Sequence, residues 1–347
     1  MKLIGWSLNG IAAITALCLV SCGGTGGGGS ETVKLQGAGA SFPAPIYSKW
    51  FKAYSAAHPN VQIDYQSVGS GSGVKSFIDK TVDFGASDAA MTPEEIGRVD
   101  PARGVQLLPM TAGSVVITYN IPNVNNLKLS RTAYSGIFLG TVKNWNDPLI
   151  AKDNPGVKLP NTPINVIVRA DSSGTTFVFS QHLSAINADF AKNPGAGNMP
   201  NWPTGTRAKG NEGVTASVKT TPGSIGYIEY GYAKSQGMPM AALQNKSGAF
   251  VEPNTASGQA ALASIQMPEN LIAWAPDPEP ADAYPIVTYT WILAYRKYPA
   301  DKLSALRGLL EYCLTDGQKD AEPLGYIPLP GPVAEKVKAA VGTLSSL

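Results

Sequence analysis

The sequence predicts an α/β protein, because short strands and helices alternate along most of its length. A strand at 32–36 precedes a small-residue loop and a helix at 43–57. An alternating strand at 61–65 precedes a Gly-Ser loop and a helix at 74–80. The β-branched run at 164–168 precedes a polar turn and another helix, and it gives the clearest example of the alternation.

The rest of the chain continues this pattern without an internal repeat. We expect further strands at 82–86, 114–120, 226–230 and 284–295, and helices at 131–139, 256–265, 304–314 and 334–341. The segment 194–213 is rich in Gly, Pro and Asn and is predicted to be a long loop. A chain of 347 residues is long enough for two lobes with a substantial core.

The composition narrows the class of protein. Hydrophobic residues make up 44% and charged residues 15% of the chain, as is typical of a globular protein. The formal net charge of +2 is too small for a protein that binds nucleic acid through its phosphates. Cys313 lies in an apolar helical context, where we expect a buried small hydrophobe. No Cys/His spacing indicates a metal site, and we expect neither a metal nor another cofactor.

The N-terminus is predicted to be a targeting segment. Lys2 precedes an apolar run at 11–20, which has the length of a signal peptide and is too short to trust as a membrane span. The residues around Cys22 are similar to a bacterial lipoprotein cleavage box. We therefore expect a signal peptide at 1–21, a lipid on Cys22 and a Gly-rich tether that completes 22–30. The alternative is an ordinary signal peptide in which Cys22 has no role, but the Gly-rich tract favours lipidation.

Three Gly/Ser/Thr turns each introduce a predicted helix, around Ser41, around Ser70 and at 173–175. At a helix start the backbone N–H groups are free to meet a guest, and the helix dipole favours an anion. Arg169, at the end of the strand at 164–168, adds a planar guanidinium suited to an oxyanion. Each turn alone is weak evidence, because most such turns only reverse the chain. Together they indicate an anion site along the sheet edge where α/β proteins bind ligands.

These residues also resemble a known family, the PstS phosphate-binding proteins of bacterial ABC transporters. The similar motifs are Gly-Ala-Gly-Ala-Ser-Phe-Pro-Ala-Pro at 37–45, Gly-Ser-Gly-Ser-Gly-Val-Lys at 69–75, Val-Asp-Phe-Gly-Ala-Ser-Asp at 82–88, Ile-Phe-Leu-Gly at 137–140, Arg-Ala-Asp-Ser-Ser-Gly-Thr at 169–175, Lys-Gly-Asn-Glu-Gly at 209–213 and Gly-Ser-Ile-Gly-Tyr at 223–227. The resemblance extends from Val33 nearly to the C-terminus, and in this order the motifs are highly specific.

The resemblance implies a two-lobed periplasmic-binding-protein fold of type II, with the ligand in the cleft between the lobes. Lobe I would comprise 31–113 and 285–347, and lobe II would comprise 114–284, with hinges near 110–114 and 283–287. The ligand would be inorganic phosphate. A monomeric receptor, anchored to the membrane by its lipid, would deliver it to the membrane subunits of an ABC transporter.

The resemblance also implies the residues that hold phosphate. They are Ser41, Phe42, Ser70, Asp88, Arg169, Ser173, Gly174 and Thr175. Most of this set offers hydroxyl or backbone N–H donors, and Gly174 lets the backbone come close to the ligand. Asp171 would orient Arg169 without touching the ligand.

Asp88 is a negative group placed toward a negative ligand. This is favourable only if the ligand carries a proton, as phosphate does at neutral pH and sulfate does not. The structural alternative is that Asp88 only shapes the turn after a strand. A receptor for sulfate or molybdate also stays open, as does a secreted phosphatase that uses the same anion cage. The phosphatase would need metal ligands or an activated nucleophile, which the sequence does not show, so we expect no enzymatic activity.

Overall fold

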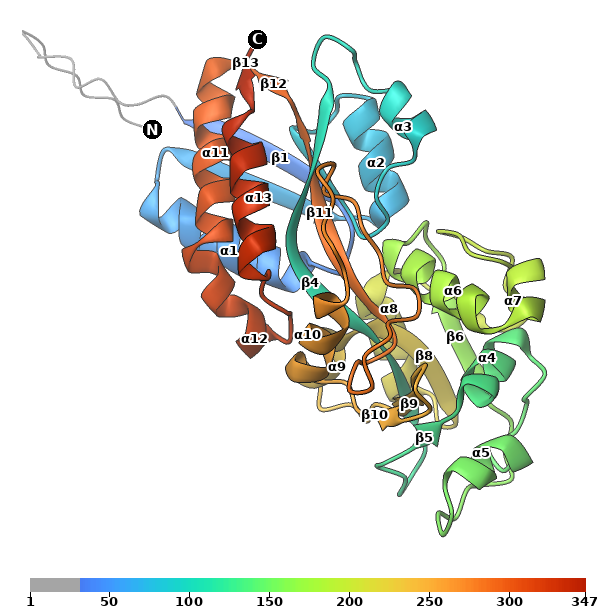
Figure 1. Ribbon diagram of the computed structural model, residues 1–347. Coiled ribbons are helices and arrows are strands. Elements are labelled where there is room, and N and C mark those ends of the chain that lie inside the picture. The colour runs from blue at the N-terminus through green and yellow to red at the C-terminus, as the bar shows by residue number, and fades with distance from the viewer. Residues whose placement is uncertain (1–31) are drawn as a thin grey trace, which may run out of the picture. The chain divides into compact units, whose positions relative to one another are not determined.

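The computed structural model describes residues 32–347, and the predicted signal peptide, Cys22 and tether lie outside the described residues. The described part is built on an eight-stranded sheet with the order β2-β1-β3-β11-β4-β8-β6-β7 (Figure 1). These strands are β1 (Val33–Gly39), β2 (Val61–Ser67), β3 (Phe84–Ser87), β4 (Val105–Asn120), β6 (Asn165–Arg169), β7 (Thr206–Ala208), β8 (Ser224–Glu229) and β11 (Val287–Tyr295). The α/β class predicted from the sequence is confirmed.

Short strands and many helices surround this sheet. The short strands are β5 (Lys128–Leu129), β9 (Ala242–Gln244) and β10 (Phe250–Val251), which form a three-stranded sheet, and the pair β12 (Lys297–Tyr298) and β13 (Ser345–Ser346). The helices are α1 (Ala44–Ala57), α2 (Ser70–Ile78), α3 (Pro93–Gly97), α4 (Arg131–Leu139), α5 (Pro148–Asp153), α6 (Gly174–Ile186), α7 (Ala188–Lys192), α8 (Gly210–Thr220), α9 (Tyr230–Ser235), α10 (Thr255–Ala263), α11 (Ala300–Leu314), the 3₁₀ helix η1 (Asp316–Asp320), α12 (Ala321–Leu324) and α13 (Gly331–Gly342). Among the described residues, no helix is both long and apolar enough to cross a membrane.

Strand β4 connects two groups of strands (Figure 1). Its residues from Val105 to Ser114 pair with β11, and those from Val115 to Asn120 pair with β8. On one side of this change β1, β2 and β3 run parallel, and on the other side β6, β7 and β8 do. The change of partner lies beside the predicted lobe boundary at 113–114, and we keep the residue bounds of the lobes as a proposal.

The direction of the parallel strands decides where the site lies. Ser41 follows β1, Ser70 follows β2, Asp88 follows β3 and Arg169 ends β6. The carboxyl ends of parallel strands meet at one edge of a sheet, so each group presents its loops together. Helices α1, α11 and α13 pack in a row beside the first group, and α2 lies across β1 and β3 from them (Figure 1). Cys313, on α11, is fully buried, as the sequence predicts.

Two helices show how local sequence sets the boundaries. Helix α4 spans Arg131–Leu139 as predicted, and Gly140 ends it with a φ of 73°, a left-handed conformation that glycine adopts without a steric penalty. Helix α2 begins at Ser70, before the predicted start at 74, so the predicted Gly-Ser loop was wrong. Gly69 precedes α2 with a φ of 94°, and the small residues that suggested a loop form the first turns of the helix.

Two other predictions were also wrong. Strand β4 begins at Val105 and not at 114, because Pro109 does not interrupt it. A register shift opposite Pro109, between Thr290 and Trp291, accommodates the missing N–H. The predicted loop at 194–213 contains β7 and the start of α8. Burial of Val214 and Val218 against the sheet stabilises α8 despite its Gly-rich start.

We predict that Gly73→Ala destabilises the protein although alanine is the better helix former. A Cβ on Gly73 would lie 2.4 Å from the Cα of Gly39, 2.7 Å from the carbonyl oxygen of Ala38 and 2.9 Å from that of Ala86. These are backbone atoms of β1 and β3 and cannot rotate away. The free energy of unfolding in urea should fall by about 1–3 kcal/mol. Gly342→Ala, which meets nothing within 4 Å, should change it little. Equal stability of the two variants would contradict this packing.

Candidate anion-binding site

The predicted binding residues gather where helices begin. Ser41 and Phe42 directly precede α1, Ser70 is the first residue of α2, and Gly174 is the first residue of α6. A hydrogen bond from the N–H of Gly174 to Ser70 Oγ, 3.0 Å long, joins the starts of α2 and α6. The side chains of the predicted binding residues are at most 2% exposed. The positive ends of these helices therefore face a region that water does not reach.

Arg169 is held by Asp171, as the resemblance implies. Its Nε donates to Asp171 Oδ1 at 2.8 Å, and its Nη2 donates to Asp171 Oδ2 at 2.5 Å. Its Nη1 points the other way and donates to Thr175 Oγ1 at 3.3 Å. Burial opposes ionisation of both partners, but their hydrogen bonds outweigh it, raising the pKa of Arg169 and lowering that of Asp171. The guanidinium thus stays charged and presents its Nη1 end to the site.

Asp88 directly follows β3 and contacts Ser70 and Gly174 of the predicted binding residues. Its Oδ1 accepts a 2.8 Å hydrogen bond from Thr290 Oγ1 of β11, and its backbone N–H donates to Ser70 Oγ at 3.3 Å. A Cβ on Gly174 would lie 2.7 Å from Asp88 Oδ2, so only glycine allows this approach. Burial raises the pKa of Asp88 to about 7, although the hydrogen bond from Thr290, the charge of Arg169 and the nearby Thr175 hydroxyl oppose the shift.

Three hydroxyls of the set have both lone pairs occupied by protein donors. Ser41 Oγ accepts from the N–H and the Nδ2 of Asn211, at 3.0 and 2.9 Å. Ser70 Oγ accepts from the N–H groups of Gly174 and Asp88. Thr175 Oγ1 accepts from Arg169 Nη1 and, at 3.2 Å, from Asn211 Nδ2. A hydroxyl has two lone pairs and one proton, so each can only donate further.

Asn211 is the residue of the site that the sequence analysis missed. It is fully buried at the start of α8, and its Nδ2 reaches both Ser41 and Thr175. Its Oδ1 accepts a 2.9 Å hydrogen bond from the N–H of Glu229. Because an N–H can only donate, this bond fixes the amide with Nδ2 toward the hydroxyls. Asn211 belongs to the motif Lys-Gly-Asn-Glu-Gly at 209–213, which is part of the family resemblance. Because that motif lay in a predicted loop, the sequence analysis gave Asn211 no role.

Two predicted residues have structural partners of their own. The Ser173 hydroxyl accepts the N–H of Thr176 at 3.0 Å and so caps α6. The Phe42 carbonyl accepts a 2.7 Å hydrogen bond from Tyr326. In both bonds an oxygen of the residue is the acceptor. The hydroxyl proton of Ser173 and the N–H of Phe42 are therefore still available as donors. All eight predicted residues are thus buried around the starts of α1, α2 and α6 or at the ends of the neighbouring strands.

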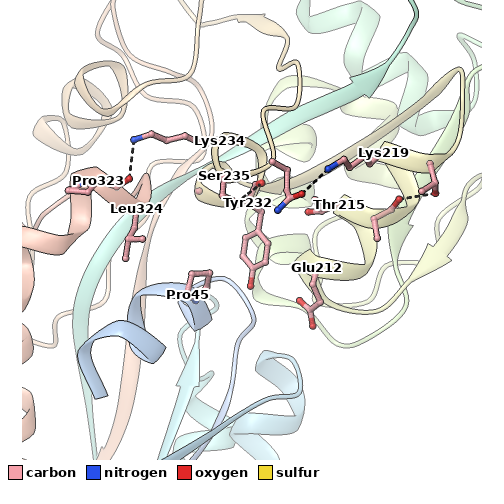
Figure 2. Close-up of a pocket in the computed structure, with 13 residues that line it drawn as sticks. Pro45, Glu212, Thr215, Lys219, Tyr232, Lys234, Ser235, Pro323 and Leu324 are labelled. Atoms are coloured by element: carbon pink, nitrogen blue, oxygen red, sulfur yellow. Dashed lines mark hydrogen bonds between the residues drawn. The ribbon is translucent and has the colours of Figure 1, made fainter. Parts of the chain in front are cut away.

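A groove of about 690 Å³ borders this site between α1, α8, α9 and α12 (Figure 2). Tyr232 lines it and donates its hydroxyl to the Ser41 carbonyl at 2.7 Å. Both lysines in the groove donate hydrogen bonds within the protein. Lys219 donates to Gln236, and Lys234 donates to backbone carbonyls of α12 (Figure 2). The groove contains none of the eight predicted residues, and we do not assign the anion site to it.

The second histidine of the sequence has no free nitrogen for proton transfer. His182 is fully buried on α6, with Nε2 bonded to the Tyr134 hydroxyl at 2.8 Å and Nδ1 to the Pro276 carbonyl at 2.6 Å. Burial lowers its pKa to about 4. Within residues 32–347, no three His, Cys, Asp or Glu side chains form a group that could hold a metal ion.

Comparison with known proteins places this geometry in a class. A family model described as the PBP superfamily domain matches residues 26–316. A periplasmic phosphate-binding protein solved with bound phosphate has a TM-score of 0.74 at 21% identity, covering 88% of this chain and 93% of its own. A phosphate-binding protein from Stenotrophomonas maltophilia has a TM-score of 0.73 at 22% identity, with the same coverage. The protein is therefore a two-lobed binding protein of the PBP superfamily, and the predicted fold is confirmed.

Curated relatives identify the family within this class. The phosphate-binding protein PstS of Pasteurella multocida (strain Pm70) is 40% identical over 89% of this chain and 90% of its own length. PstS of Methanocaldococcus jannaschii is 38% identical over 94% of this chain and 93% of its own. The chain belongs to the PstS family of phosphate-binding proteins. These relatives are named binding proteins and not enzymes, in agreement with the sequence analysis.

We predict that Asp88 makes stability in the absence of anion depend on pH. Its pKa is about 7 in the folded protein against an ordinary 3.8, so the folded state binds more protons between these values. Stability should therefore fall as pH rises from about 4 to 7 and then level off. Urea unfolding should show the parent losing stability relative to Asp88→Asn across this range. Asp64→Asn, on the exposed side of β2, should track the parent. A constant difference between parent and Asp88→Asn would contradict the shifted pKa.

Proposed function

We propose that this protein is an extracytoplasmic receptor that binds inorganic phosphate and delivers it to the membrane subunits of an ABC transporter. One observation carries the proposal. The buried site combines hydroxyls that can only donate with a single central carboxyl group, Asp88. Hydrogen phosphate has the matching pattern, with several acceptor oxygens and one O–H. The names of the PstS relatives support the same ligand.

Each predicted residue receives a role in this proposal. Ser41, Ser70 and Thr175 donate their hydroxyl protons to phosphate oxygens, and Arg169 adds its Nη1 end as the cationic donor. Phe42 contributes a backbone N–H group at a helix start, and Ser173 adds its hydroxyl. The N–H of Gly174 donates to Ser70 Oγ and so leaves the Ser70 proton for the ligand, and its lack of a side chain lets the backbone come close. Asp88 accepts the phosphate proton. Asp171 keeps Arg169 charged and oriented without touching the ligand.

Sulfate fits this arrangement poorly. In a site that excludes water, sulfate and an ionised Asp88 would face one another without a hydrogen between them. That arrangement costs the desolvation of two acceptors and adds their repulsion. The preference for phosphate thus comes from the unfavourable free energy of binding sulfate beside Asp88, in addition to favourable contacts with phosphate.

Burial of the site also implies a motion. Arg169, Asp88 and Ser70 are at most 2% exposed, so an anion cannot reach them unless the structure opens. We propose that lobe I (31–113 and 285–347) and lobe II (114–284) separate, with hinges near 110–114 and 283–287. The segment 110–114 belongs to β4, and the segment 283–287 ends at Val287, the first residue of β11, which pairs with Ser114 beside the change of partner. We further propose that the receptor works as a monomer.

We predict that Asp88→Asn weakens the preference for phosphate over sulfate. The amide removes the negative charge and supplies a donor, so sulfate should bind at least about tenfold tighter than to the parent at pH 8, a change of about 1.4 kcal/mol. Phosphate should lose less, because its O–H can still donate to the amide oxygen. Isothermal titration with both anions measures this, with Asp64→Asn as the charge-matched control. An unchanged preference in a less stable variant would make Asp88 a turn-forming residue only.

The lipid anchor on Cys22 belongs to the same proposal. A tether at 22–30 spans about 15 Å as a flexible chain, from about 5–6 Å times the square root of its length, and would keep the receptor close to its transporter. We predict that Cys22→Ser moves the protein out of the membrane fraction, in soluble or unprocessed form. Cys313→Ser, a change at a buried position, should leave the fractionation unchanged. A Cys22→Ser protein that stays with the membrane as the parent does would refute the anchor.

A further inference from the structure

Two segments meet at the rim of the site, in the first turn of α2 and in the turn before α6. The N–H of Gly71 donates to the carbonyl of Ser172 at 3.0 Å. Next to this bond, inside the site, the N–H of Gly174 donates to Ser70 Oγ. Gly71 and Ser172 are only partly buried, so their contact belongs to the rim and not to the core.

Space for a side chain at residue 71 is absent. A Cβ there would lie 2.1 Å from Ser172 Oγ and 2.5 Å from Ser172 Cβ. The hydroxyl could rotate away, but the Cβ is fixed by its backbone. Carbon atoms in contact lie about 3.5–4.0 Å apart, so the two segments would have to move apart by about 1 Å.

The backbone gives no other reason for glycine at this position. Gly71 lies within α2, and its φ is not positive, whereas that of Gly69 is 94°. Glycine inside a helix is less favourable than alanine. The close approach to Ser172 is therefore the feature that requires a residue without a side chain.

The contact lies across the proposed opening. Gly71 belongs to lobe I and Ser172 to lobe II as proposed above. An anion enters only when these lobes separate, so the bond between Gly71 and Ser172 forms when the site closes. A side chain at 71 would meet nothing in the open form and would prevent full closure.

We propose that the contact between Gly71 and Ser172 sets the affinity for phosphate, by allowing the starts of α2 and α6 to close on the ligand. The proposal rests on the proposed function. Holding the segments about 1 Å apart would stretch the bond between Gly174 and Ser70, so that the Ser70 hydroxyl would no longer be directed at the anion and the starts of α2 and α6 would lie farther from it. The residue pair thus controls affinity from outside the set of groups that touch phosphate.

The test is Gly71→Ala, studied with and without inorganic phosphate. In its absence the melting temperature should be equal to or above that of the parent, because alanine favours α2. The dissociation constant for phosphate should rise about tenfold to a hundredfold, as expected for overpacking by one methyl group. Gly97→Ala, in α3 with nothing within 4 Å of its Cβ, is the matched control and should bind phosphate as the parent does.

A second substitution distinguishes closure from general damage. In Gly71→Ala combined with Ser172→Gly, the atoms at 2.1 and 2.5 Å are gone, and the Ser172 carbonyl oxygen, at 3.5 Å, makes an ordinary contact. Phosphate affinity should return to within about threefold of that of Ser172→Gly alone. A Gly71→Ala protein that binds phosphate like the parent, that melts lower without phosphate, or that Ser172→Gly fails to rescue would overturn the proposal. A parent protein that does not bind phosphate would instead overturn the proposed function, and this inference with it.

Discussion

Exclusion of water from the site is the constraint on which the rest of the structure depends. Arg169 and Asp88 are at most 2% exposed. Moving an ion out of water costs several kcal/mol of free energy unless an opposite charge or hydrogen bonds compensate it. Asp171 accepts two hydrogen bonds from the Arg169 guanidinium, and these bonds keep both groups ionised. Asp88 accepts a hydrogen bond from the Thr290 hydroxyl and forms no ion pair within residues 32–347, and burial raises its pKa to about 7. The two carboxyl groups therefore differ, since the pKa of Asp171 is lowered by Arg169 and that of Asp88 is raised toward neutrality.

The fold brings the remaining donors, hydroxyls and backbone N–H groups, together at helix starts. The two groups of parallel strands run in opposite directions, and the starts of α1, α2 and α6 meet where the carboxyl ends of one group face those of the other, with Asn211 of α8 beside them. Backbone N–H groups at helix starts have no partner within the helix and carry a partial positive charge. They need no bulky side chains, which explains why glycine and serine dominate these turns. The absence of side chains at Gly174 and Gly71 is then what allows the turns to approach one another.

The sequence was sufficient for features that depend on local patterns. Helix α4 and Gly140 were predicted because periodicity and a C-terminal glycine act within one segment. The eight candidate site residues were predicted from motifs in the order of a known family, and the structure buries all of them near helix starts and strand ends. Helix α8 was missed because its first residues resemble a loop, and its stability comes from burial of Val214 and Val218 against strands distant in sequence. The orienting role of Asn211 was missed for the same reason, since its partners Ser41, Thr175 and Glu229 lie in three other segments of the chain.

Asn211 also connects the site to the point where β4 changes its partner. Its Oδ1 accepts the N–H of Glu229, and Glu229 is paired with Val115, the first residue of β4 to pair with β8. Its Nδ2 and N–H reach across to Ser41, which precedes α1 in the other proposed lobe. Separation of the lobes would break both bonds to Ser41 and leave its hydroxyl free to accept as well as donate. In the proposed motion the hydroxyl would be directed as a donor only when the lobes are together, so closure would also align this donor toward the anion.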